Sequence, residues 1–147
     1  MTIAIRPLRL DERADWEVLW KGYLDFYKTA APPAVYDTTW TRLHDPAEPM
    51  GLLGGIVDGK LRGIVHYIFH RSCWTVGDYC YLQDLFVAED ARELGLGRAL
   101  IEAVYRTARE AGASRVHWLT HETNAAARAL YDTLADRPGF IQYRKLF

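Results

Sequence analysis

Apolar residues recur with two periods along the chain, and each period predicts a kind of element. Ile3 and Ile5, two residues apart, with Leu8 just beyond, predict an opening strand. Asp11 then has the position and side chain of a helix cap. Behind it an aromatic-rich stripe follows at steps of three and four residues: Trp16, Leu19, Trp20, Tyr23, Leu24 and Tyr27. This spacing places the stripe on one face of a helix, either as core or as the wall of a substrate site.

Strand patterns dominate the middle of the chain. Pro32-Pro33 interrupts the first helix, and the weakly periodic residues 35–43 predict another short one. Aliphatic and aromatic residues then form three candidate strands, at residues 50–57, 61–70 and 79–87. Asp58-Gly59-Lys60 separates the first two of these and is a hairpin signal.

Helix and strand patterns alternate in the last third of the chain. An amphipathic helix is predicted from Leu96 to its stop at Gly112, and a second from Asn124 to Leu134. A short strand is predicted at 116–120 and a last one at 140–147. The order predicts a mixed α/β fold in a single domain, residues 1–147, with a mostly antiparallel sheet and one parallel crossover near its end.

Composition narrows the choice of partners. The 147 residues carry a formal net charge of −1, which argues against a nucleic-acid partner. No apolar run approaches the roughly 20 residues of a membrane span, so we expect a cytoplasmic protein without a membrane partner. Cys73 and Cys80 lie apart from any metal-ligand spacing, so we expect reduced thiols and no metal.

A glycine pair marks the junction between the third candidate strand and the helix that follows it. Free backbone N–H groups and the helix dipole make such a junction a potential anion site, and glycine lets a phosphate approach closely. A dinucleotide fingerprint would require a small residue where Leu100 stands. A P-loop would require Lys-Ser or Lys-Thr where Arg98-Ala99 follows Gly97. A plain helix-starting turn remains the alternative.

Two motifs resemble the GNAT superfamily of N-acetyltransferases. Residues 81–98, with Leu85-Phe86-Val87 leading into Arg92-x-x-Gly95-x-Gly97, resemble its coenzyme A motif. Some thirty residues on, a second motif resembles its N-x-x-A-x-x-L-Y helix, in Asn124, Ala127, Leu130 and Tyr131. The chain is most similar in pattern to the fungal histone/polyamine acetyltransferase and the diamine acetyltransferase subgroups. The resemblance implies the GNAT acyl-CoA N-acyltransferase fold, with six to seven strands flanked by about four helices.

The same resemblance implies acetyl-CoA as cosubstrate and assigns its contacts. The coenzyme would lie between two parting strands and use these residues: Leu85, Phe86, Val87, Arg92, Glu93, Leu94, Gly95, Leu96, Gly97, Arg98 and Asn124. Two departures from the family pattern stand out. Glu93 replaces the usual glycine and puts an acid beside the pyrophosphate, and seven residues, Asp132 to Pro138, separate Tyr131 from Gly139.

Acetyl transfer from a thioester to an amine requires a free amine, an oxyanion donor and a proton for the leaving thiolate. The resemblance assigns the oxyanion donor to the backbone N–H near Phe86, and the proton donor to Tyr131. In the polyamine enzymes the base is a glutamate at the position of Gln83, and glutamine cannot take a proton. The candidates to replace it are Asp84, Glu122 and His121, or a water chain held by Gln83 and Tyr81.

We expect the acceptor to be a small-molecule or peptide amine. The aromatic first helix, with Tyr36, Trp40, Trp74 and Asp78, could build an aromatic, mildly acidic mouth suited to a polyamine, an amino acid such as lysine or an analogue, or a protein amine. The residues expected to bind this substrate are Tyr27, Trp74, Tyr81 and Asp84. Two other hypotheses stay open. The chain could be a catalytically weak module that binds or senses coenzyme A, or an interaction protein. A homodimer formed through the sheet edge and the final strand is expected in either case.

Overall fold

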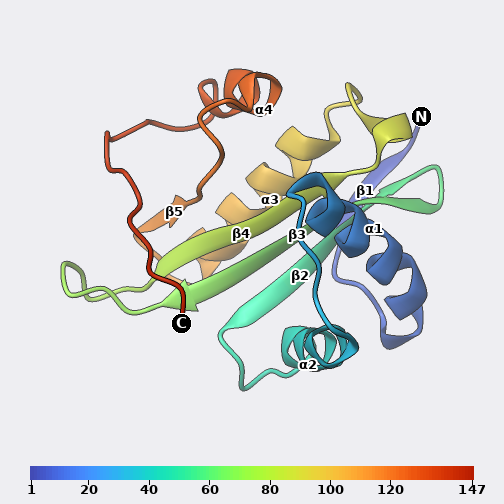
Figure 1. Ribbon diagram of the computed structural model, residues 1–147, viewed down its shortest axis with the longest axis horizontal. Coiled ribbons are helices and arrows are strands. Elements are labelled where there is room, and N and C mark those ends of the chain that lie inside the picture. Colours follow the sequence, from blue (N-terminus) through green and yellow to red (C-terminus); the bar gives the residue numbers. More distant parts are fainter.

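A computed structural model describes residues 1–147. The strands are β1 (Ile3–Arg6), β2 (Met50–Val57), β3 (Lys60–His70), β4 (Tyr79–Val87) and β5 (Arg115–His117). The helices are α1 (Arg13–Phe26), α2 (Pro33–Leu43), α3 (Leu96–Glu110) and α4 (Ala125–Tyr131), with short 3₁₀ turns at Leu10–Glu12 and Glu89–Ala91. The five strands form one sheet in chain order (Figure 1). The first four pair antiparallel and β5 joins β4 in parallel, so the predicted mixed α/β class is confirmed.

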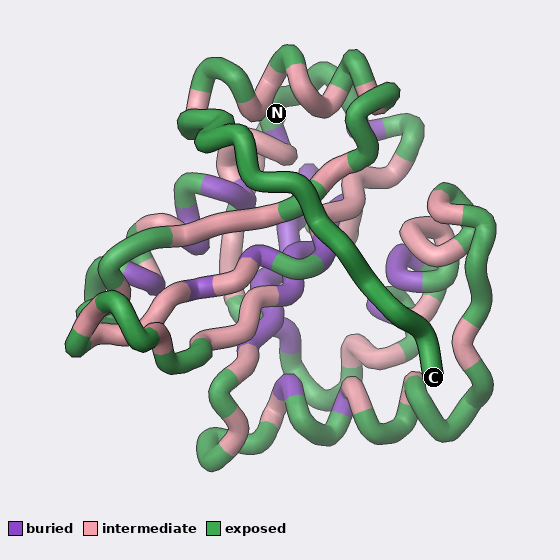
Figure 2. The backbone as a smooth tube through the Cα atoms, turned by 60° about the vertical axis from the view of Figure 1, so that its left-hand side comes forward, coloured by how far each residue is buried: buried purple, intermediate pink, exposed green.

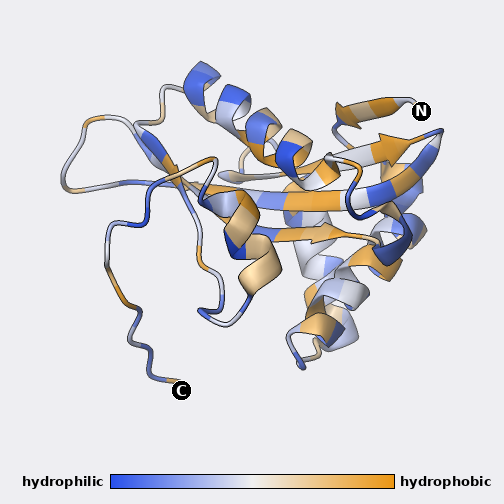
Figure 3. Cartoon of the chain, turned by 90° about the horizontal axis from the view of Figure 1, so that it is seen from above, coloured by the Kyte–Doolittle hydropathy of each residue, from blue (hydrophilic) through white to orange (hydrophobic).

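The sheet separates two apolar cores. Helix α3 covers one face, whereas α1 and α2 cover the other (Figure 3). The α3 core is aliphatic and includes Val65, Leu100 and Val104, all fully buried. The core on the α1 face is aromatic and centres on Trp16, which lies 5.3 Å from Trp20 between ring centroids. Burying apolar area on both faces of one sheet is the main favourable term for a fold of this size.

The aromatic stripe of the first helix is confirmed as core over most of its length. Trp16, Leu19 and Trp20 are buried, while Tyr23 is half-buried. Tyr27 follows the last residue of α1 as its C-cap, and its ring lies 4.9 Å from that of Tyr23 and 5.3 Å from that of His121 between centroids. The stripe is therefore core at its start, and the part at its end stays a prediction for the wall of a substrate site.

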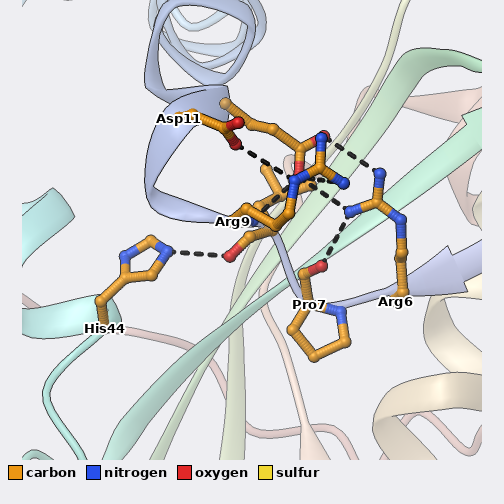
Figure 4. Close-up of polar contacts among 7 residues, drawn as sticks. Arg6, Pro7, Arg9, Asp11 and His44 are labelled. Atoms are coloured by element: carbon orange, nitrogen blue, oxygen red, sulfur yellow. Dashed lines mark hydrogen bonds and ion pairs between the residues drawn. The ribbon is translucent and has the colours of Figure 1, made fainter.

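Glu12, not Asp11, organises the entry into α1, so the cap expected at Asp11 is wrong. The Glu12 carboxylate accepts from both terminal nitrogens of Arg6, at 2.8 and 3.1 Å, and from the Arg9 backbone N–H at 2.8 Å. Asp11 instead pairs with the Arg9 side chain (Figure 4). The carboxylate one residue closer to α1 reaches the strand, because the chain turns through a short 3₁₀ segment first. The corner thus ties α1 to β1.

The predicted last strand is wrong, and the sheet has five strands rather than six to seven. No backbone group of residues 136–147 bonds to another backbone group. This segment is exposed throughout (Figure 2). Its alternating composition suits a strand, but an extended segment becomes a strand only where an edge pairs with it. The strand predicted at 116–120 is also shifted, to Arg115–His117.

None of the helices is both long enough and apolar enough to span a membrane.

We expect Glu12→Gln to destabilise the protein by about 1–2 kcal/mol at neutral pH, because charge-assisted bonds at a half-exposed corner are lost. The Arg6 guanidinium lowers the pKa of Glu12 to about 2. A lowered pKa contributes stability above the ordinary carboxyl range and loses it as pH falls toward 2. Urea unfolding should therefore show the two proteins converging between about pH 4.5 and pH 2. Asp11→Asn is the control, and an equal loss there would contradict the assignment.

Candidate functional site

Strands β4 and β5 are paired over only three residues. Tyr79, Cys80 and Tyr81 face Arg115, Val116 and His117, and β5 then ends. The chain turns from there toward α4 (Figure 1). From Leu82 to Val87, β4 is paired on one side by β3 and open on the other. The open half-edge carries the predicted strand residues Leu85 to Val87, so it is the natural centre of the candidate site.

A β-bulge in β4 sets which side chains face α1. Asp84 pairs with His66 and Leu82 pairs with Tyr67, so Gln83 is left without a partner in the ladder. An extra residue shifts the alternation of side chains by one position. Leu82 therefore lies in the α3 core, whereas Asp84 is bonded to His66 on the α1 face. The bulge brings Asp84 to the face that also holds the candidate Tyr81.

The ladder also decides which main-chain groups of β4 are free. The Ala88 N–H donates to the Arg62 carbonyl, across the pair from β3. Alternation along an antiparallel ladder then turns Phe86 toward Ile64 and turns Leu85 and Val87 toward the open edge. The Phe86 ring packs on α1, where a Cβ on Gly22 would lie 2.9 Å from it. Phe86 is therefore badly placed to supply the oxyanion donor expected of it.

Six consecutive backbone N–H groups, from Glu93 to Arg98, have no acceptor within the protein. The bond before them runs from the Arg92 N–H to Glu89, and the first helical bond after them runs from Ala99 to Gly95. Glu93 and Gly95 have left-handed backbone, with φ of 66° and 81°. Left-handed residues alternating with others form a concave array of N–H groups, and the dipole of α3 adds positive potential. The loop thus has the features of an anion site.

The side chains of two arginines, Arg92 and Arg98, bond to groups next to this loop. The Arg92 Nε donates to the Val87 carbonyl at 3.3 Å, at the end of the open edge. Arg98 donates to the Thr133 hydroxyl at 2.8 Å, which ties the start of α3 to the segment after α4. Their guanidinium groups therefore supply positive charge at the rim of the loop.

Helix α4 begins on the other side of the open edge. The side-chain oxygen Oδ1 of Asn124 accepts from the Ala127 N–H at 3.4 Å, so Asn124 caps the helix. Its amide nitrogen lies 3.5 Å from the Thr120 hydroxyl. The Leu130 side chain would lie 3.5 Å from a Cβ on Gly97, which places α4 against the start of α3. The two motifs found in the sequence are therefore neighbours in space.

Tyr131 is a half-buried phenol at the end of α4. Its ring packs edge-on against Trp118, with centroids 5.4 Å apart. Burial, and to a smaller extent the neighbouring Tyr27, raise the pKa of Tyr131 to about 12. The hydroxyl therefore keeps its proton at neutral pH.

Asp84 is a buried carboxylate surrounded by tyrosines. It is 8% exposed, and one oxygen accepts from His66 at 2.8 Å. Burial, and then the Asp84 charge, raise the pKa of Tyr23 and of Tyr81. Burial and the same charge also raise the pKa of Tyr27, against the effect of a hydrogen bond with Thr120. A negative charge among aromatic rings suits a cationic amine.

The other predicted residues differ in how close they come to this cluster. His121 lies 5.3 Å from Tyr27 between ring centroids. Gln83 is exposed at the bulge, and its carbonyl accepts from the Tyr23 hydroxyl at 3.5 Å. The Glu122 side chain is exposed. Trp74 is 77% exposed in the loop that precedes β4, at the opposite end of that strand from the glycine loop, so the structure does not bring it into the site.

Sequence reasoning missed His66 and Trp16 as residues connected to the site. His66 bonds Asp84 through Nδ1 and accepts from the Trp16 indole at Nε2, at 2.9 Å. The available signal was a histidine in an otherwise apolar strand, between Val65 and Tyr67. Both cysteines are free thiols, as expected, with Cys80 buried and Cys73 exposed.

Comparison with known proteins agrees with the two sequence motifs. The model of the Acetyltransferase (GNAT) family matches residues 15–135. The chain is 36% identical over 145 residues to the D-amino-acid N-acetyltransferase HPA3 of Saccharomyces cerevisiae, covering 97% of this chain and 90% of that one. It is also 35% identical to a thialysine N-epsilon-acetyltransferase of Caenorhabditis elegans, over 49% of this chain and 44% of that one.

Solved structures share the fold at low identity. A ribosomal-protein-alanine N-acetyltransferase of Brucella melitensis has a TM-score of 0.83 at 23% identity, over 99% of this chain and 100% of that one. The aminoglycoside acetyltransferase AAC(6')-Iy, bound to a bisubstrate analogue of coenzyme A, has a TM-score of 0.84 at 18% identity, with both chains covered completely. These likenesses confirm the predicted fold.

The two glycines of the loop should respond differently to a methyl group. Gly95→Ala should cost about 1–2 kcal/mol, because alanine is strained at a φ of 81°. Gly97→Ala should leave stability unchanged or raise it by up to about 1 kcal/mol, since its Cβ would meet Leu130 at ordinary contact distance. Urea unfolding of the pair measures the difference, and equal effects would contradict the loop conformation.

Proposed function

The chain belongs to the GNAT acetyltransferase family and is an N-acetyltransferase, and on this premise we propose that it moves the acetyl group of acetyl-CoA to a primary amine. The observation that carries the proposal is the row of six free N–H groups beside the open edge of β4. The amine attacks the thioester directly, without a covalent acyl-enzyme. Burial raises the pKa of Cys80 to about 11, and Cys73 lies in the loop before β4, at the opposite end of that strand from the glycine loop.

Coenzyme A would use main-chain groups for most of its contacts. The N–H groups from Glu93 to Arg98 suit the pyrophosphate, and Arg92 and Arg98 add charge at the rim. The N–H and C=O groups of Leu85 and the N–H of Val87 suit the amides of the pantetheine arm, in the manner of an added strand, while the Val87 carbonyl is bonded to Arg92. Asn124 would bond the arm from the other side. Glu93 adds a carboxylate to the loop itself, which is an unfavourable charge beside a pyrophosphate.

The chemical step needs two donors that this region can supply. The oxyanion that forms on the acetyl carbonyl accepts a hydrogen bond from a backbone N–H of the open edge. The Leu85 N–H replaces that of Phe86 as the donor, because Phe86 is turned toward Ile64 of β3. The nitrogen–carbon bond forms, the carbon–sulfur bond breaks, and Tyr131 gives its proton to the departing thiolate. The nitrogen loses one proton to water as the amide forms and Tyr131 regains one from water, so this step produces no net proton.

Asp84 is the acidic group that we assign to the acceptor. It attracts the protonated amine, and the proton leaves the amine through Asp84 or through water beside Tyr81 and Gln83 before attack. Glu122 and His121 are exposed and lie on the loop before α4, so they suit the mouth of the site better than its floor. A small cationic amine fits this arrangement, such as a polyamine or the amine of an amino acid.

We also propose a homodimer built on the final segment. Five large apolar side chains there are at least 75% exposed: Phe140, Ile141, Tyr143, Leu146 and Phe147. Strand β5 lies at the edge of the sheet and offers only three paired residues. A second copy would cover both features. Light scattering should give twice the chain mass, and replacing Phe140 and Ile141 by serine should give the monomer; a monomeric starting protein would contradict the proposal.

The activity is tested by release of free thiol from acetyl-CoA with a panel of amines. The panel holds a polyamine, lysine, thialysine, a D-amino acid and a peptide with a free amino group, since the named relatives include enzymes for two of these. We expect turnover with at least one small cationic amine. Coenzyme binding without turnover across the panel would instead support a coenzyme-binding module.

Tyr131→Phe should lower kcat by about 100-fold or more, because the thiolate loses its positioned acid. Coenzyme affinity, measured by calorimetry, should stay within about twofold, since the phenol acts on the leaving group rather than on binding. Tyr67→Phe, which alters a tyrosine of β3 whose ring lies against Gly51, is the matched control. An unchanged kcat in Tyr131→Phe would remove this residue from the mechanism.

A further inference from the structure

The core on the α1 face contains a chain of three polar groups. Trp16 is fully buried, His66 is 3% exposed and Asp84 is 8% exposed, and the last two are the only buried polar or charged residues of the protein. Burying such groups costs free energy unless every one of them is hydrogen-bonded. The chain satisfies this demand, since Trp16 bonds His66 and His66 bonds Asp84.

The Trp16 indole N–H is the first donor, and it determines where the protons of all three groups lie. An indole N–H can only donate, so His66 Nε2, 2.9 Å away, accepts. The imidazole proton is then on Nδ1 and is donated to the Asp84 carboxylate at 2.8 Å. His66 is therefore neutral, and Asp84 is the one charged member of the three hydrogen-bonded groups.

The geometry keeps this arrangement rigid. The Trp16 ring lies between Trp20 and Trp40, with centroids 5.3 and 4.9 Å away. His66 stands opposite Asp84 in the ladder, at the bulge that turns Asp84 to this face. Asp84 has one oxygen held by His66, and the side chains of Tyr23, Tyr27 and Tyr81 lie around it toward the open edge of β4.

We propose that Trp16 and His66 are positioning residues: the indole keeps the imidazole neutral, and the imidazole holds Asp84 as an oriented carboxylate that receives the protonated acceptor amine. The inference rests on the proposed function for the identity of the amine site. It assigns to a buried tryptophan a role in acceptor binding that its contacts with the core alone would not give it.

The consequence is a latent pH switch that Trp16 suppresses. An imidazole whose Nε2 no longer accepts a hydrogen bond can take a proton there. The imidazolium would neutralise Asp84 and oppose the cationic amine. The other titratable groups around this pair are Tyr23, Tyr27 and Tyr81, and Tyr36 on α2 lies against Trp16. Burial raises the pKa of each of these four tyrosines, so all keep their protons. On β2 the partner of His66 is Leu52, which does not titrate.

The test compares Trp16→Phe, His66→Asn and His66→Leu in the full chain. In Trp16→Phe we expect KM for the amine to rise about tenfold at pH 6 and to approach the wild-type value at pH 8.5. An imidazolium that neutralises Asp84 would weaken binding of the cationic amine by about that factor. His66→Asn keeps a neutral donor at the position of Nδ1 and should stay within about threefold at both pH values. His66→Leu, without a donor, should raise KM at both. Coenzyme affinity should not change in any of them.

The double variant Trp16→Phe/His66→Asn should lose the pH dependence, because no imidazole remains to take a proton. A pH dependence that persists in it, or a loss in His66→Asn as large as in His66→Leu, would overturn the proposal. Circular dichroism confirms that each variant is folded before its kinetics are compared. Where Trp16→Phe does not fold, the two His66 variants decide.

Nuclear magnetic resonance gives a result that does not depend on activity. The imidazole ¹⁵N signals of His66, assigned by their loss in His66→Asn, should show a proton on Nδ1 and none on Nε2 at pH 7.5. A proton on Nε2 would refute the fixed proton arrangement. If no amine is acetylated but this pattern holds, the proposed function fails while the hydrogen-bonded arrangement of Trp16, His66 and Asp84 stands.

Discussion

The incomplete pairing of β4 is the constraint on which the rest of the site depends. Its antiparallel partner β3 follows it along its whole length, whereas its parallel partner β5 leaves after three residues. Main-chain N–H and C=O groups exposed in this way need partners, and an extended ligand with amides of its own can supply them. Every other part of the site is placed relative to this edge: the glycine loop continues from its end, α4 stands across from it, and Asp84 lies beside its bulge.

The sequence indicated the parts of the site that are built from backbone. Glycine at 95 marks a left-handed residue, and Asn124 marks a helix start, because both residue types are selected by local geometry. Helix α3 was predictable because its apolar period repeats several times, and the strands at 50–57 and 79–87 because each is a short run of apolar or aromatic residues. Periodicity is a local property and survives without knowledge of the fold.

Features that depend on contacts between distant segments were not predictable. The bulge at Gln83 arises from the pairing of β3 with β4, and it alone brings Asp84 to the face of Tyr81. The bond from Trp16 to His66 joins residues fifty positions apart. Residues 140–147 have the composition of a strand, but no edge pairs with them. In each case the deciding partner lies elsewhere in the chain, where no local pattern shows it.

The anion loop has a consequence for how such a protein diverges. Its six N–H groups belong to the backbone, which every amino acid except proline provides in the same form. Substitutions that keep the turn therefore keep the cradle, whatever side chains they introduce. The aromatic cluster around Asp84 consists of side chains, and a single replacement there changes its shape or charge. A lineage built on this scaffold can thus exchange the molecules it modifies while the donor it consumes stays constant.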